Sequence, residues 1–232
     1  PILSLKVPAS RIIGGYTVKD GVIVPNFSHA EIIGSVFHRT RIPVGVMTSA
    51  KLLSAIEPII RYHRSRFRGG DAQPGTPRFD QGLQMKEDAL QRLADLWACG
   101  EAGSSLGFDA SRKADLLDPL EKEKEAQFHA QGLTGPRAQL SALKKMEPQV
   151  LEYLNLLYTP EDKRDASGLQ GRFAELQADI FVQSIVLDAE TNVLIPACKL
   201  WCPGVGANMM REAVSLVGGY GVTEDCPGFL FQ

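Results

Sequence analysis

The chain has 232 residues, of which 44% are hydrophobic and 22% are charged, and its formal net charge is −2 with an isoelectric point near 6.1. This balance is typical of a globular protein and excludes a disordered or fibrous chain. It gives no global attraction to nucleic acid or to anionic lipid, so neither is an expected partner. The sequence contains no run of eighteen apolar residues and therefore predicts no membrane span.

Four cysteines are too few and too scattered for a disulfide scaffold. Cys198 and Cys202 lie four residues apart on one face of a predicted helix, but no histidine or second close pair accompanies them, so no metal site is expected. Buried, reduced thiols are the better interpretation. No secretory or transit segment opens the sequence, which favours the cytoplasm, with the mitochondrial matrix as the alternative in a eukaryote.

The first 27 residues have the pattern of extended structure. Aliphatic residues are interrupted there by Pro8, Gly14-Gly15, Asp20-Gly21 and Pro25. This spacing predicts one to three short strands, and Asp-Gly is a strong signal for a hairpin turn.

From about residue 28 the apolar residues recur at intervals of three and four, which indicates helices. A loop is predicted over 68–82, a break at Thr159-Pro160, and the end of the last helix at Gly218-Gly219. The predicted helical segments are 28–67, 83–104, 119–131, 136–158, 168–188 and 191–217. The fold class expected is mainly α, with a short β segment in front.

Three blocks carry a family pattern. Residues 6–14 have the sequence Lys-Val-Pro-Ala-Ser-Arg-Ile-Ile-Gly, and a long predicted helix begins at Thr40-Arg41 and ends in Arg64-Ser65-Arg66-Phe67. The third block runs from Ala197-Cys198-Lys199 in the last predicted helix to Pro227, and its residues 215–227 read Ser-Leu-Val-Gly-Gly-Tyr-Gly-Val-Thr-Glu-Asp-Cys-Pro.

In this order the blocks resemble the C-terminal half of the acyl-CoA dehydrogenase family. That family has an Arg-x-x-Phe-Gly helix ending and a Gln-x-x-Gly-Gly-x-Gly stretch; Arg68, Ser215 and Leu230 depart from its pattern. The resemblance implies an up-down helical bundle. It assigns 1–27 to the closing strands of a middle β-domain and 28–232 to the bundle, with 109–190 as a helical insertion.

The resemblance implies that FAD is the cofactor and that Arg64, Arg66, Phe67, Gly218 and Gly219 bind it. An arginine and Phe67 would reach FAD across a dimer interface, and the glycine pair would contact the pyrophosphate of a neighbouring subunit's FAD. The residues alone allow a second interpretation. The glycines can form a helix cap with a tight turn, and the arginines can stabilise the end of their helix.

For the substrate, an acyl-CoA thioester, the resemblance implicates His38, Thr40 and Arg41. Arg41 would position the thioester and the catalytic base, although a surface arginine is the alternative. Thr40 cannot act as a base, so the family's glutamate is expected beyond Gln232. That base would remove the α-proton while the β-hydride passes to flavin N5.

The expected assembly is a homo- or hetero-oligomer, a dimer of dimers, that passes electrons to an electron-transfer flavoprotein. Two alternatives remain open. One is an acyl-CoA oxidase or a related flavin enzyme acting on an unusual acyl-CoA. The other is a bundle subunit without catalytic activity.

Overall fold

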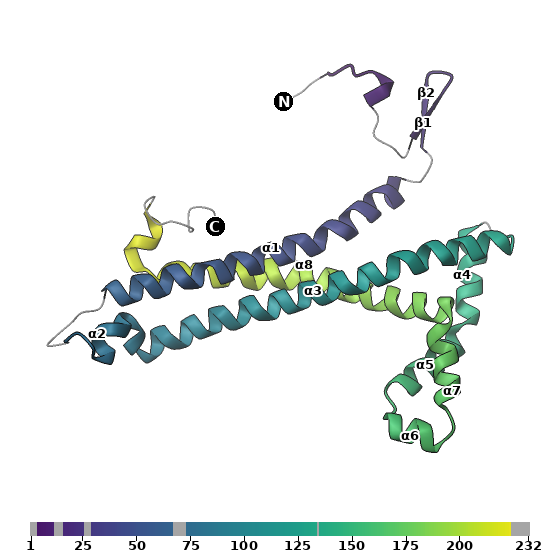
Figure 1. Ribbon diagram of the computed structural model, residues 1–232. Helices are drawn as coiled ribbons and strands as arrows, with labels where there is room; N and C mark the ends of the chain where they lie inside the picture. The colour runs from purple at the N-terminus through teal and green to yellow at the C-terminus, as the bar shows by residue number, and fades with distance from the viewer. Residues whose placement is uncertain (1–3, 12–15, 26–28, 67–72, 134, 224–232) are drawn as a thin grey trace.

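A computed structural model shows a mainly helical chain with a two-stranded sheet ahead of the helices (Figure 1). The structure describes residues 4–11, 16–25, 29–66, 73–133 and 135–223. Three long helices form its main layer: α1 (His29–Arg66), α3 (Glu87–Ala130) and α8 (Ile180–Leu216). The predicted fold class is thereby confirmed at the level of a mainly helical protein with a short β lead-in.

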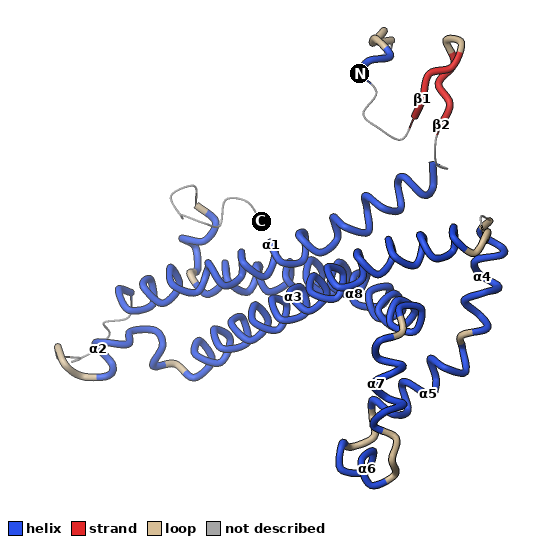
Figure 2. The backbone as a smooth tube through the Cα atoms, turned by 45° about the vertical axis from the view of Figure 1, so that its right-hand side comes forward, coloured by secondary structure: helices blue, strands red, loops and turns tan. Residues whose placement is uncertain are grey.

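The β segment is a single hairpin, as its turn residues predicted. β1 (Tyr16–Lys19) pairs antiparallel with β2 (Val22–Pro25), and the turn residues Asp20 and Gly21 have φ of 51° and 77°. Positive φ at both turn positions is the geometry that Asp-Gly favours in a two-residue hairpin. Figure 2 shows the hairpin standing apart from the helical layer, and η1 (Ala9–Arg11) is a short 3₁₀ turn before it.

The three long helices run side by side, and each contacts the other two (Figures 1 and 2). The main core cluster lies toward the end of the layer where α1 and α8 finish. A second, smaller cluster of Ile42, Ala110 and Ile195 continues the apolar seam toward the other end. Fully or nearly fully buried members of the main cluster are Leu52, Ile59, Leu96, Ala213 and Val217.

Glycines allow these helices to approach closely. A Cβ on Gly45 of α1 would lie 2.3 Å from Cys198 Sγ, and one on Gly103 of α3 would lie 2.3 Å from Ser49 Oγ. Cys198 and Cys202 are free thiols buried against these glycines, as the sequence predicted. Burial and the neighbouring Cys202 raise the pKa of Cys198 to about 11, so the thiol stays protonated at neutral pH.

Of the three long helices, α1 matches the segment predicted over 28–67, whereas α3 and α8 exceed their predicted lengths. α3 begins at Glu87, within the segment predicted over 83–104, and continues to Ala130, through the segment predicted over 119–131. α8 joins the end of the segment predicted over 168–188, whose first part is α7 (Gln170–Ala178), to the segment predicted over 191–217. Glycine lowers intrinsic helix propensity, but close packing overrides that preference inside α3. Asp179 caps α8 by accepting hydrogen bonds from Phe181 N (2.8 Å) and Val182 N (3.0 Å), which fixes where this helix begins.

The loop predicted over 68–82 is partly helical. The described part contains α2 (Pro77–Gln81), with proline in its first turn, followed by the 3₁₀ helix η2 (Gly82–Met85). Gly82 has φ of 58°, and a Cβ there would lie 2.0 Å from the carbonyl oxygen of His63. Only glycine fits this position, so the connection packs tightly against the end of α1.

Between α3 and α8 the chain forms a projecting arm (Figure 1). Its helices are α4 (Pro136–Lys145), α5 (Glu147–Leu157), α6 (Glu161–Ala166) and α7 (Gln170–Ala178). The helix predicted over 136–158 divides at Met146, whereas the break at Thr159-Pro160 is confirmed. The arm has its own core, formed by Tyr153, Leu156, Phe173 and Leu176 with Val182 of α8.

Two helical stretches, Arg39–Arg66 and Ile180–Leu216, are long and apolar enough to cross a membrane by length and composition alone. Core helices of water-soluble proteins meet the same criteria, and both stretches supply the packed core of this layer. Even so, only 39% and 22% of their most apolar windows are buried. Much of both helices therefore remains apolar and uncovered in the described chain.

The glycine contacts give a first test. Gly45→Ala should lower the free energy of unfolding by about 1–3 kcal/mol, because its Cβ would overlap a buried sulfur. Gly204→Ala is the matched control in α8, since a Cβ there meets nothing within 4 Å, and it should raise stability by about 0.5–1 kcal/mol. Urea unfolding followed by circular dichroism measures both changes. Equal stabilities for the two variants would show that the helices are not held at this separation.

Candidate functional site

The ends of α1 and α8 meet at one end of the helical layer, and this brings together residues that are distant in sequence (Figure 1). Arg64 and Arg66 close α1, while Gly218 and Gly219 open the 3₁₀ helix η3 (Gly218–Val222) that follows α8. Four of the five predicted cofactor residues therefore share this end. The fifth, Phe67, lies outside the described residues.

An aromatic pair joins the two segments. The rings of Tyr62 and Tyr220 are stacked, with centroids 5.6 Å apart and planes 4° from parallel. Arg66 Nε donates a hydrogen bond to the hydroxyl of Tyr62 at 3.1 Å, and a Cβ on Gly218 would lie 4.0 Å from that same hydroxyl. The arginine segment and the glycine turn thus form one continuous surface.

The three glycines of η3 are subject to different structural constraints. Gly218 has φ of 59°, a conformation that favours glycine, and Gly221 is buried with its hypothetical Cβ 2.6 Å from the carbonyl oxygen of Val214. Gly219 has neither requirement, because its φ is not positive and a Cβ would meet nothing within 4 Å. It is also exposed, so its backbone is open to a ligand.

His63 joins the end of α1 to the end of α8. It is 1% exposed, and its Nε2 lies 2.8 Å from the carbonyl oxygen of Leu216. Since a carbonyl only accepts, Nε2 carries the proton, and Nδ1 is left as a buried acceptor with no hydrogen-bond partner among the described residues. Burial lowers the pKa of His63 below its ordinary value, and the bond to Leu216 opposes that shift only in part.

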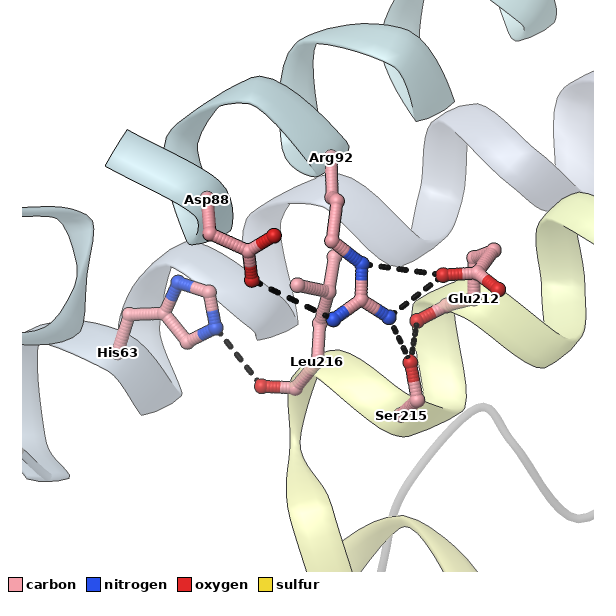
Figure 3. A network of polar contacts seen from close by, with 6 residues as sticks. All are labelled: His63, Asp88, Arg92, Glu212, Ser215 and Leu216. Carbon is pink, nitrogen blue, oxygen red and sulfur yellow. Dashed lines mark hydrogen bonds and ion pairs between the residues drawn. The ribbon is translucent and has the colours of Figure 1, made fainter. Parts of the chain in front are cut away.

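Arg92 makes the corresponding connection from α3 (Figure 3). Its Nε donates to Glu212 Oε2 at 3.0 Å, and its Nη2 donates to the same oxygen and to Ser215 Oγ. The carboxylate of Asp88 lies 3.8 Å from Nη1. The last turn of α8 is therefore held by side chains from both neighbouring helices.

His63 and Arg92 were not among the site residues that the sequence predicted. His63 continues the inward stripe of Ile56 and Ile59 on α1, which is a signal for burial. Nothing local indicates that its partner would be the carbonyl of a residue more than a hundred positions away.

The predicted substrate residues lie elsewhere. Thr40 and Arg41 are on α1, roughly 30 Å along the helix from Tyr62 at about 1.5 Å per residue. The hydroxyl of Thr40 donates to the carbonyl of Phe37 at 3.3 Å, and Arg41 is half-buried. His38 is in α1, but its side chain lies outside the described part of the structure. One chain therefore does not place the predicted substrate and cofactor residues together.

An open pocket of about 840 Å³ lies between α1, α3 and α8, beside the segment that carries Thr40 and Arg41. Arg39 pairs with Asp118 at 2.8 Å, and Lys122 also contacts that carboxylate; both cations lower the pKa of Asp118. The charged residues that line the pocket are Arg39, Asp115, Asp118, Glu121 and Asp188. Because four carboxylates and one arginine line it, the pocket has a negative formal charge that disfavours binding of the phosphates of a CoA.

Across the described ranges, no cluster of three histidine, cysteine or acidic side chains is placed to hold a metal ion.

The environment of His63 predicts a pH dependence of folding. Because its pKa is lower in the folded state than the ordinary 6.5, the unfolded chain binds the extra proton more readily in acid. Stability should be complete above pH ~6.5 and fall as the pH decreases toward the folded-state pKa. Unfolding free energies of the wild type and of His63→Gln, measured between pH 7 and pH 5, isolate this contribution, because the other histidines are common to both proteins. Parallel pH profiles would contradict it.

Comparisons with known proteins find no match: no family model matches the chain, and no curated protein or solved structure is similar to it. The geometry at the ends of α1 and α8 therefore indicates which ligand this surface suits. The surface presents the exposed Arg66, which is joined through Tyr62 to the glycine turn, and an exposed glycine that neither conformation nor packing against the described residues requires. Such a surface is suited to an anion that contacts a guanidinium group and backbone.

Proposed function

We propose that the chain is part of an FAD-dependent acyl-CoA dehydrogenase, in which Arg64, Arg66, Gly218 and Gly219 contribute to the site of the FAD pyrophosphate. The observation that carries the proposal is Gly219. Where folding alone would accept another residue, a glycine leaves the backbone open in the turn whose Tyr220 stacks on Tyr62, the hydrogen-bond partner of Arg66. The resemblance of both segments to one family's cofactor motifs points in the same direction.

The charges at this end favour an anion. Guanidinium groups bind phosphate through paired hydrogen bonds, and both arginines are exposed. Glu212 is engaged by Arg92 and is not free to repel a phosphate. The carbonyl of Leu216, which would otherwise face outward from the end of α8, accepts the proton of His63. The residues present are therefore compatible with a pyrophosphate.

The site would be shared between subunits. FAD, when bound, supplies the acceptor for the β-hydride of the acyl-CoA thioester. Arg41 is roughly 30 Å along α1 from Tyr62, the residue that stacks on the glycine turn. The FAD that reacts beside Arg41 would therefore have its pyrophosphate held by another chain. Arg41 then orients the thioester, and a glutamate beyond Gln232 takes the α-proton. This division of the site between chains requires an oligomer. The proposal also includes an electron-transfer flavoprotein as the electron acceptor and the cytoplasm as the location.

Gly219→Val tests the proposal directly. A Cβ there would meet no atom of the described residues within 4 Å, so stability should change by no more than about 0.5 kcal/mol. The same side chain would occupy the place of the pyrophosphate, and the affinity for FAD should fall about tenfold or more. Fluorescence titration of the complete purified protein with FAD measures this affinity. A variant that binds FAD as well as the wild type would remove Gly219 from the site.

Arg66→Met should likewise weaken FAD binding about tenfold, because a charge-assisted hydrogen bond to phosphate is lost. The matched control is Arg61→Met, which removes the same charge from the same helix. Arg61 is five residues away, about 140° around α1, and pairs with Glu57. Its substitution should leave the affinity unchanged.

The wild-type protein should show a flavin absorption band near ~450 nm that bleaches when acyl-CoA is added. Absence of any flavin binding by the complete protein would instead favour a bundle subunit without catalytic activity.

A further inference from the structure

We infer that His63 and Arg92 are positioning residues, which fix the last turn of α8 and so set the orientation of the Gly218–Gly219 turn toward the pyrophosphate. The inference rests on the proposed function. Neither residue is placed in contact with the cofactor. Each acts through α8: His63 through the carbonyl of Leu216, and Arg92 through Glu212 and Ser215.

The last turn of α8 is held from two sides (Figure 3). From α1, His63 donates to Leu216 O at 2.8 Å, two residues before Gly218. From α3, Arg92 binds the side chains of Glu212 and Ser215. Beyond this point Tyr220 and Gly221 pack against the layer, whereas among the described residues a Cβ on Gly219 would meet nothing within 4 Å and one on Gly218 would reach only Tyr62. The direction in which the turn leaves the layer therefore depends on how firmly the end of α8 is fixed.

Packing alone does not account for a histidine at position 63. Its Nδ1 is buried and has no hydrogen-bond partner in the part of the chain that the structure describes, and an unsatisfied buried acceptor costs about 1–3 kcal/mol. A leucine would fill similar space without this penalty. What the histidine adds is a donor aimed at Leu216. Gly82 fits against the carbonyl of His63, so the backbone that carries this donor is fixed as well.

The same two residues counter an electrostatic obstacle. The C-terminal end of a helix carries a partial negative charge from its unpaired carbonyls, which opposes the binding of an anion nearby. Arg92 places a positive charge at the last turn of α8, and His63 covers one of its last carbonyls. An anion approaching Gly219 thus meets a helix end whose negative potential has been reduced.

The test compares His63→Leu with His63→Gln in the complete protein. Hydrogen–deuterium exchange of the amides of residues 217–223, without FAD, reports on the turn itself. Fluorescence titration gives the affinity for FAD. His63→Leu should accelerate exchange and raise the Kd about tenfold. Glutamine can donate an amide N–H to Leu216 O, so His63→Gln should restore both quantities to within about threefold of the wild type.

Thr191→Val is the matched control. In α8, the buried hydroxyl of Thr191 donates a hydrogen bond to the backbone carbonyl of Asp188, far from the glycine turn. Its loss should change neither the exchange rates of residues 217–223 nor the Kd for FAD. Should His63→Leu fail to fold, Arg92→Met provides the same readouts through a partly exposed side chain.

The outcomes are distinguishable. Unchanged exchange in both His63→Leu and Arg92→Met would overturn the positioning role, as would faster exchange with an unchanged Kd. If His63→Gln folds but its Kd for FAD stays as high as that of His63→Leu, the hydrogen bond to Leu216 is not what sets the affinity. A wild-type protein that binds no FAD would remove the proposed function, and this inference with it.

Discussion

The close, glycine-mediated approach of α1, α3 and α8 is the constraint on which the other features of the layer depend. At Gly45, Gly103 and Gly107 the neighbouring helices occupy space that a Cβ would need. A helix pair packed through glycines has little freedom to slide, because any shift brings side chains into the contact. The relative positions of the helix ends are therefore set from within the layer. His63 reaches Leu216, and Arg92 reaches Glu212, only because this register is fixed.

The elements that the sequence predicted correctly are those with strong local signals. Asp20-Gly21 requires positive φ at two successive positions and so specifies a hairpin turn. Thr159-Pro160 breaks a helix because proline lacks the amide donor and restricts the residue before it. Gly218 follows the last helix with positive φ, as expected for a helix end.

Features that depend on distant contacts were not predictable in this way. The glycines of α3 carry a low helix propensity, and only their packing against α1 and α8 explains why the helix continues to Ala130. The division at Met146 arises where a new helix begins with proline in its first turn. For His63 and Arg92, burial and charge were visible in the sequence, but their partners on α8 were not. The two segments that resemble cofactor motifs could be identified one by one, whereas their meeting at one end of the layer is a property of the fold.

The distribution of the site along the chain constrains how it could work. Arg41 lies in the first half of α1, whereas the glycine turn follows the end of α8 and packs against Tyr62 near the other end of α1. A second copy of the chain is the simplest way to bring an Arg41 beside a cofactor held by another chain's glycine turn. The apolar surfaces that α1 and α8 leave uncovered, with Met47 and Leu200 70% and 79% exposed, supply the contact area such an arrangement requires. Under the proposed function, the exposed helix faces and the separation of Arg41 from the glycine turn have one cause, because a chain that contributed half of a shared site would also keep the surface that pairs it with the other half.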